Sequence, residues 1–125
     1  MLAGPAEART LGGLRRQLDR FLREAGFSAE GTTALALAFQ EAGANVIRHG
    51  RGETLRVTVE LEGGEAVLRV HDYCGEKNAA CLSAEPPAQL RPGGLGMHLI
   101  RSSTDDARLE PEEGGRLALV LRKRS

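Results

Sequence analysis

Residues 55–72 read LRVTVELEGGEAVLRVHD, and their pattern decides the fold. Apolar and polar residues alternate over the first seven positions, which is typical of a strand with one buried face. The pair Gly63–Gly64 predicts a hairpin turn, and a return strand then covers Ala66–Asp72. Asp72 has the parity of the apolar Leu68, so we expect its side chain to point toward the core, where an acid needs a partner or a ligand.

Two amphipathic helices precede this hairpin. Leucines spaced three and four residues apart predict a helix over Glu7–Ala25, with Gly26 as its left-handed C-terminal cap. A serine N-cap begins a second helix, Ser28–His49. Gly31 and Gly43 lie inside it and lower its helix propensity by about 1 kcal/mol each. We expect such glycines where another element packs closely.

The remainder of the chain predicts a loop, a helix and a second hairpin. Tyr73–Pro92 has no hydrophobic period and contains three prolines, so we expect a long loop that acts as a lid over about residues 73–96. A helix, Met97–Ser103, and strands at Ala107–Leu109 and Leu117–Lys123 follow. The order predicts an α+β two-layer sandwich, with a mostly antiparallel sheet covered on one face by helices. We expect residues 1–125 to form a single domain.

Composition excludes several classes of function. Among 125 residues, Lys+Arg and Asp+Glu each number 17, which argues against a basic nucleic-acid-binding surface. Trp is absent and aromatic residues make up 3%, so a stacking platform for single strands is not expected. No apolar run approaches the roughly 20 residues of a membrane span, and we find no export signal. With two cysteines, we expect a reducing, cytoplasmic location and no membrane partner.

Three groups of residues are candidates for chemistry. Glu41, Asn45 and His49 are spaced by four, so they share one side of a helix. Glu41 is a candidate general base, and the Asn45 carboxamide oxygen suits Mg²⁺, although an exposed polar stripe would have the same pattern. Asp72 followed by Gly75 suits recognition of an amino group with close backbone approach, although a plain strand-to-turn aspartate is the competing interpretation.

The third group is a glycine-rich segment, Gly93-Gly94-Leu95-Gly96, at the start of the predicted third helix. Its backbone N–H groups would suit phosphate, and a glycine hinge is the competing interpretation. It is neither a P-loop nor a dinucleotide fingerprint. A zinc site is disfavoured because the spacing of the candidate ligands matches no common pattern. Those ligands are His71, Cys74, Cys81 and His98.

Together the motifs resemble one superfamily. Glu41 to His49 looks like the N box, Val70 to Asp72 like the first glycine box, and Gly93 to Ile100 like the second glycine box of the histidine-kinase-like (GHKL) ATPases. The short chain resembles bacterial anti-sigma-factor serine/threonine kinases within that superfamily. The resemblance covers nearly the whole chain and implies a Bergerat-type fold with ATP and Mg²⁺ as cofactors.

The resemblance also implies roles for single residues. Asn45 would be the Mg²⁺ ligand, Asp72 would accept a hydrogen bond from the adenine amino group, and Glu41 would be the general base on a partner's serine or threonine. The other predicted nucleotide-binding residues are His49, Gly75, Gly94, Leu95 and Gly96. The implied partner is a small anti-sigma antagonist of the STAS type, and a sigma factor and a homodimer are compatible with it.

Departures from the family pattern motivate an alternative. Cys74 stands where the family has the first glycine of its first box, and Glu76 stands where it has the second. Arg116 occupies the place of a threonine that often supports the adenine site. The first hypothesis is therefore an ATP-dependent kinase that regulates transcription. The second is a degenerate binding module that sequesters a sigma factor or another regulator without turning over ATP.

Overall fold

The alternating stretch forms two strands, β2 (Thr54–Glu62) and β3 (Glu65–Gly75), in the computed structural model, which describes residues 2–49, 54–75 and 99–125. They pair in antiparallel register, with Val59 opposite Leu68. Gly63 and Gly64 in the turn have φ of 58° and 81°, a region that glycine enters without steric cost. The predicted hairpin is confirmed.

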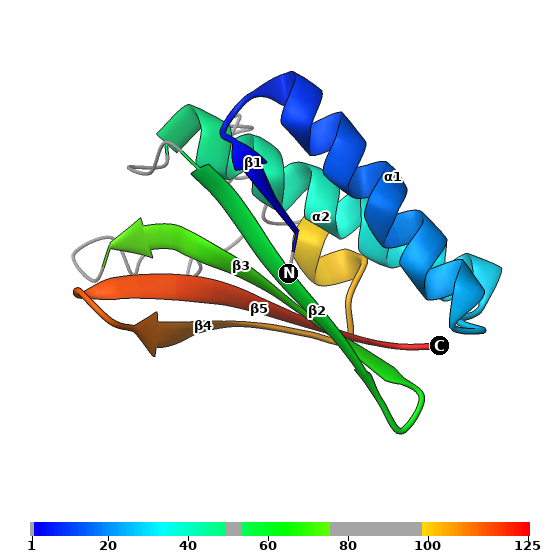
Figure 1. Cartoon of the computed structure of the whole chain (residues 1–125). Helices are drawn as coiled ribbons and strands as arrows, with labels where there is room; N and C mark the ends of the chain where they lie inside the picture. The colour runs from blue at the N-terminus through cyan, green and yellow to red at the C-terminus, as the bar shows by residue number, and fades with distance from the viewer. Residues whose placement is uncertain (1, 50–53, 76–98) are drawn as a thin grey trace.

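The described strands form one antiparallel sheet in the order β1-β2-β3-β5-β4 (Figure 1). The second hairpin consists of β4 (Asp106–Glu112) and β5 (Arg116–Arg124), and β5 pairs with β3 at the centre of the sheet. The edge strand β1 (Leu2–Pro5) was not expected from the sequence, because four residues are too short to reveal a period. β4 is longer than the predicted Ala107–Leu109 and contains a proline, which an edge strand tolerates.

Helices α1 (Ala8–Glu24) and α2 (Ala29–His49) cover one face of the sheet (Figure 1). Gly26 has φ of 87°, and the N–H of Phe27 donates to the carbonyl of Leu22 at 2.9 Å, which completes a Schellman cap on α1. The Ser28 hydroxyl accepts a hydrogen bond from the N–H of Gly31 at 3.0 Å, so the predicted N-cap is confirmed. The α+β sandwich with helices on one face is as predicted.

The core lies between the helices and the sheet. Its largest fully buried side chains come from α1, α2, the three central strands and a helical turn at residues 99–102. They include Phe39, Leu18, Leu22, Leu35, Leu55, Leu68, Ile100, Leu119 and Leu121. The two helices cross closely at Gly43, where an added Cβ would collide with the Leu11 side chain. The glycine therefore has the packing reason expected for it.

The structure corrects the predicted start of the long loop and describes only part of the predicted third helix. The long loop was expected to begin at Tyr73, but β3 continues to Gly75, because Cys74 and Gly75 pair with Leu117 and Arg116 of β5. The rest of the expected lid lies outside the described residues. Of the predicted third helix, residues 99–102 are described and are helical.

Candidate functional site

Asn45 is the anchored polar group of the predicted N box. Its side chain lies near the end of α2 with 9% exposure, which is low for a polar residue. Its Nδ2 donates a hydrogen bond to the hydroxyl oxygen of Tyr73 at 3.0 Å. Its Oδ1 accepts one from the Arg48 guanidinium at 2.7 Å. These two bonds fix which end of the carboxamide is oxygen and hold that oxygen beside a cation.

Glu41 lies one helical turn before Asn45 on the same side of α2. Its side chain is half-buried, and within the described chain it makes no hydrogen bond or ion pair. A carboxylate with no partner is available to accept a proton. His49 is the last residue of α2, and its side chain is not among the described ones.

Sequence reasoning missed Arg48 and Tyr73 as neighbours of Asn45. Arg48 could have been found, since a residue three positions after Asn45 on a helix lies beside it. Tyr73 could not, because the parity of β3 places it on the outer face. It reaches the core, 7% exposed, because the strand is irregular at this point.

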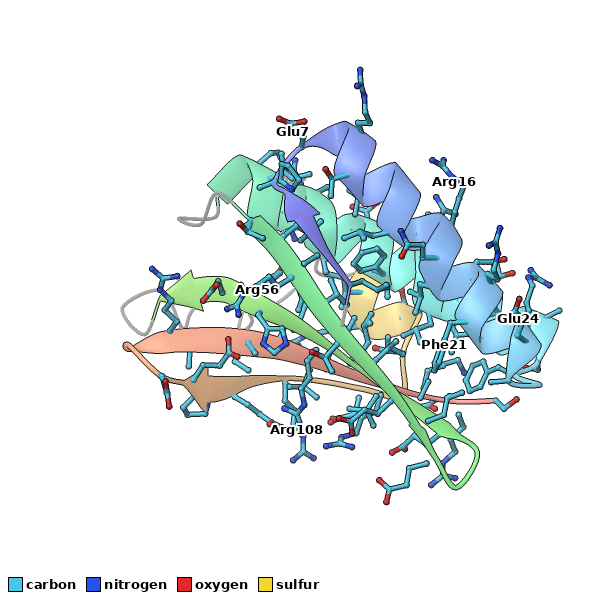
Figure 2. The ribbon with its side chains drawn as sticks, in the orientation of Figure 1. Glu7, Arg16, Phe21, Glu24, Arg56 and Arg108 are labelled. Atoms are coloured by element: carbon cyan, nitrogen blue, oxygen red, sulfur yellow. The ribbon has the colours of Figure 1, made fainter. Side chains whose placement is uncertain are left out.

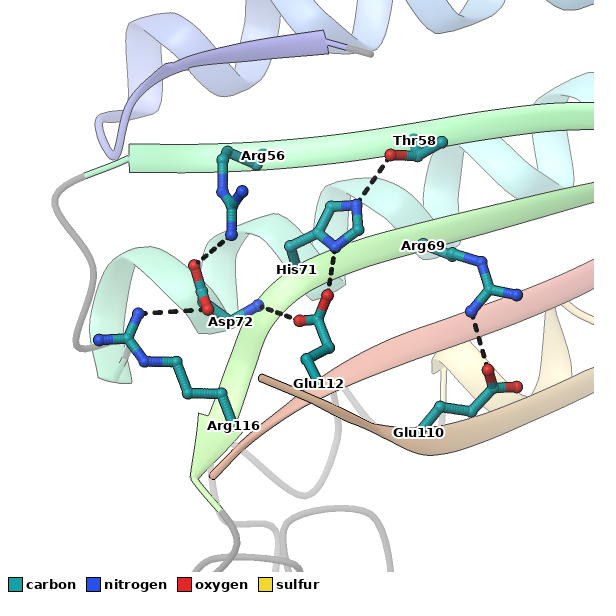
Figure 3. A network of polar contacts seen from close by, with 8 residues as sticks. All are labelled: Arg56, Thr58, Arg69, His71, Asp72, Glu110, Glu112 and Arg116. Carbon is teal, nitrogen blue, oxygen red and sulfur yellow. Dashed lines mark hydrogen bonds and ion pairs between the residues drawn. The ribbon is translucent and has the colours of Figure 1, made fainter. Parts of the chain in front are cut away.

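The prediction that Asp72 points toward the core is wrong. The β3–β5 register shifts between Val70 and Cys74, and Asp72 has φ of 54°, in the left-handed region. This irregularity breaks the alternation, so Tyr73 takes the inward position. The carboxylate of Asp72 meets Arg56 of β2, which lies on the sheet face away from the helices (Figure 3).

Two arginines hold the Asp72 carboxylate. Arg56 Nη2 lies 2.9 Å from Oδ2, and Arg116 Nη1 lies 3.2 Å from Oδ1 (Figure 3). Burial raises the pKa of Asp72, but the hydrogen bonds and charges of the two arginines lower it by more, so this pKa lies below its ordinary value of 3.8. The position predicted for adenine recognition is therefore engaged within the protein.

A second polar chain supports the irregular end of β3. His71 Nε2 lies 2.8 Å from the Thr58 hydroxyl, and His71 Nδ1 lies 2.6 Å from Glu112 Oε2 (Figure 3). The backbone N–H of Asp72 donates to Glu112 Oε1 at 3.1 Å. Glu112 thus ties the side chain of one β3 residue and the backbone of the next to edge strand β4. These contacts link β2, β3 and β4 on the outer face.

The other predicted site residues are placed only in part. Gly75 ends β3 opposite Arg116, while Gly94, Leu95 and Gly96 lie outside the described residues. Within residues 2–49, 54–75 and 99–125, no three His, Cys, Asp or Glu side chains gather as a metal site. Across those same ranges, no helix combines the length and hydropathy that a membrane crossing requires.

Comparison with known proteins supports the family resemblance. Residues 4–123 match the family model described as the histidine kinase-like ATPase domain. A comparison with curated protein sequences gave no match.

Two of the solved structures that match this chain illustrate the shared fold. This chain is similar to one in the crystal structure of the RsbU and RsbW domains of Rv1364c from Mycobacterium tuberculosis, with 20% identity and a TM-score of 0.67. That match covers 98% of this chain but 32% of the other, so this chain spans about a third of its length. It is also similar to a chain in the SiaB–SiaC complex from Pseudomonas aeruginosa, with 17% identity and a TM-score of 0.62. The second match covers 97% of this chain and 86% of that chain.

The family model covers nearly the whole chain, including the helix that carries Glu41 and Asn45 and the strand that carries Asp72. The N box and the glycine boxes that suggested the resemblance lie within the matched range. The chain belongs to the histidine kinase-like ATPase domain family.

Proposed function

We propose that this protein binds ATP and transfers its γ-phosphoryl group to a serine or threonine of a small STAS-type protein, and so regulates transcription in the cytoplasm. The observation that carries the proposal is the buried Asn45 carboxamide, whose oxygen is held by Arg48. Glu41 lies one turn before it on α2, and its carboxylate has no partner among the described residues. Phosphoryl transfer asks a protein mainly for positioning and charge stabilisation, and these side chains supply both.

The residues present fit Mg²⁺ at Asn45. Mg²⁺ prefers hard oxygen ligands and is usually held by one or two protein groups together with phosphates and water. The Asn45 oxygen is such a ligand, and the Tyr73 hydroxyl keeps the amide nitrogen turned away from that position. When bound, the ion would neutralise charge on the phosphates. Arg48, which is exposed apart from its bond to Asn45, has the charge and reach to bind a phosphate oxygen instead.

Glu41 has the role of general base. Its carboxylate would take the proton from the partner's hydroxyl while that oxygen forms its bond to the γ-phosphorus and the bond to the leaving ADP breaks. His49 and the glycine segment Gly94–Gly96 remain predicted nucleotide contacts. Asp72 remains the predicted acceptor for the adenine amino group, on condition that its carboxylate leaves Arg56 and Arg116.

A protein partner is supported by one of the similar structures, which is a complex of SiaB with SiaC. Its STAS type follows from the resemblance described above. Binding of a sigma factor and formation of a homodimer remain predictions, and so does the single-domain organisation of residues 1–125.

The double ion pair at Asp72 favours a second candidate function. A carboxylate held by Arg56 and Arg116 must exchange two contacts before it meets adenine. A domain that does not make this exchange would keep the fold and bind a regulator without ATP turnover. Measuring nucleotide binding therefore distinguishes the kinase from the binding module.

Calorimetric titration with ATP, with and without Mg²⁺, tests the proposal. We expect binding that requires Mg²⁺ and that Asn45→Ala weakens at least tenfold, while Glu30→Gln, at the far end of the same helix, changes nothing. No binding at millimolar ATP, which corresponds to about 4 kcal/mol, would favour the binding module.

A transfer assay with γ-labelled ATP and a purified STAS-type protein tests the base. We expect Glu41→Gln to keep Mg-ATP affinity within twofold and to lower the transfer rate at least a hundredfold. Full transfer by Glu41→Gln would contradict the assignment of Glu41.

A further inference from the structure

A groove lies between α1 and α2 on the side of the helix layer away from the sheet. Its volume is about 660 Å³, within the usual range of ligand sites. Arg16, one of its lining residues, points away from the sheet in Figure 2. The lining residues are Gly12, Arg15, Arg16, Asp19, Arg20, Arg23, Thr33, Ala36 and Gln40. None of them belongs to the proposed nucleotide site.

The groove holds positive charge that no described residue balances. Arg23 pairs with Asp19 at 2.9 Å, which neutralises one of its four arginines. The other three, Arg15, Arg16 and Arg20, are exposed and make no ion pair with any described residue. The net charge of the protein is zero, yet three arginines without an ion-pair partner in the described part of the chain lie along one helix.

The sheet face provides the contrast. Arg56, Arg69 and Arg116 each bind a carboxylate of another strand, at 2.9, 2.8 and 3.2 Å. Arginines there bind carboxylates within the protein, whereas Arg15, Arg16 and Arg20 pair with no carboxylate in residues 2–49, 54–75 and 99–125. Complementary charge steers association and sets specificity, so the occupant should be anionic.

The remaining lining residues narrow the class of occupant. Gly12 and Ala36 are small and let a neighbouring backbone come close, while Thr33 and Gln40 offer neutral hydrogen bonds. The lining contains no aromatic side chain on which nucleic-acid bases could stack and no large apolar side chain that could enter a lipid layer. Leu37, 38% exposed, lies on the same side of α2 as Thr33 and Gln40 and adds apolar surface at the rim.

We propose that this groove docks the acidic face of an α-helix from a protein partner. Arg16 and Arg20 are spaced by four, which matches carboxylates at the same spacing on a facing helix. The lining runs along α1 from Gly12 to Arg23, about 16 Å or three turns. Arginine forks bind carboxylates bidentately, which gives orientation as well as affinity. Docking here needs no nucleotide, so the proposal stands apart from the kinase activity.

Two peptides of identical composition test the proposal against the full chain without ATP. Both are helical 15-residue peptides with four glutamates. In one the glutamates stand at positions i, i+4, i+7 and i+11, and in the other they are distributed around the helix. Fluorescence anisotropy gives the affinities, and backbone NMR shifts locate the contact. We expect the striped peptide to bind at least tenfold more tightly than the other and to shift amides of α1 and α2.

Charge variants locate the interaction. Arg16→Glu and Arg20→Glu should each weaken striped-peptide binding at least tenfold. Arg108→Glu makes the same charge change on β4, far from α1 (Figure 2), and should leave binding within twofold. If the Arg→Glu variants unfold, Arg16→Gln and Arg20→Gln replace them, and circular dichroism confirms that these variants are folded.

Several outcomes would overturn the proposal. Equal binding of the two peptides, or equal weakening by Arg108→Glu, would mean non-specific attraction by net charge. Binding of a 20-nucleotide single strand or of vesicles with 30% anionic lipid that depends on Arg16 and Arg20, without binding of the striped peptide, would assign the groove to another class of ligand.

Discussion

At the scale of the residue, the backbone of Asp72 decides what the end of β3 presents to each side. A φ of 54° there places Tyr73 among the core residues and sends the carboxylate to the outer face. One consequence is the Tyr73–Asn45 hydrogen bond that orients the proposed metal ligand. The other is the pair of arginine contacts on Asp72. The strain of an uncommon backbone conformation is thus offset by polar contacts on both faces.

Asp72→Asn should lower stability in a pH-dependent way. The carboxyl has a lower pKa in the folded protein than the ordinary 3.8, so its stabilisation is present above about pH 4 and is lost as pH falls through the folded-state pKa. We expect urea unfolding at pH 7 to show a loss of about 1 kcal/mol, allowing for the solvent exposure of both arginines. The difference should shrink at acidic pH, as the Asp72 carboxyl becomes protonated. Asp19→Asn, in an exposed pair on α1, should cost less than about 0.5 kcal/mol at either pH.

At the scale of the element, the helix pair is held by a close approach that excludes side chains. Gly43 on α2 faces Leu11 of α1, which is 3% exposed and has little room to move. Gly31, near the start of α2, lies against the Phe27 ring and the carbonyl of Arg124 at the end of β5. These contacts set the position of α2 over the sheet, and hence the positions of Glu41 and Asn45.

Gly43→Ala and Gly13→Ala make a matched pair of substitutions in helices. At Gly13 an added Cβ meets nothing within 4 Å, so helix propensity should raise stability by up to about 1 kcal/mol. At Gly43 overpacking should lower the free energy of unfolding by about 1–3 kcal/mol. This loss should exceed the gain in helix propensity, so the Gly43→Ala variant should be less stable. Thermal and urea unfolding would measure both. A stabilised Gly43→Ala variant would contradict the close contact with Leu11.

At the scale of the whole molecule, the strand order separates a central region from two edges. β3 is paired on both sides, by β2 and β5, and its residues Ala66, Leu68 and Val70 belong to the core between the sheet and the helices. β1 and β4 are the edges, where β1 has four residues and β4 carries charged side chains and a proline. Such features discourage pairing with other chains.

Native-state hydrogen exchange should follow this order. We expect the slowest amides in β3 and β5, close to the free energy of global unfolding, and much faster exchange in β1 because an edge strand of four residues opens locally. Protection at Ala3 equal to that at Leu68 would contradict the edge position of β1. Arg15, Arg16 and Arg20 on α1 should contribute little to this pattern, since they make no ion pair with another described element.

The sequence by itself determined the two long helices, the two hairpins and the layers. Period-two alternation in 55–72, the helical spacing of leucines and the caps at Gly26 and Ser28 are local signals, and each led to the observed structure. The spacing of four between Glu41 and Asn45 likewise placed both on one side of α2. Only the tertiary structure decided the rest. Strand β1 exists because β2 offers it an edge. Asp72 turned outward because pairing with β5 imposed a register shift that parity cannot foresee. The basic groove arose because two helices packed side by side. All three depend on contacts between residues far apart in the chain, which a local pattern does not encode.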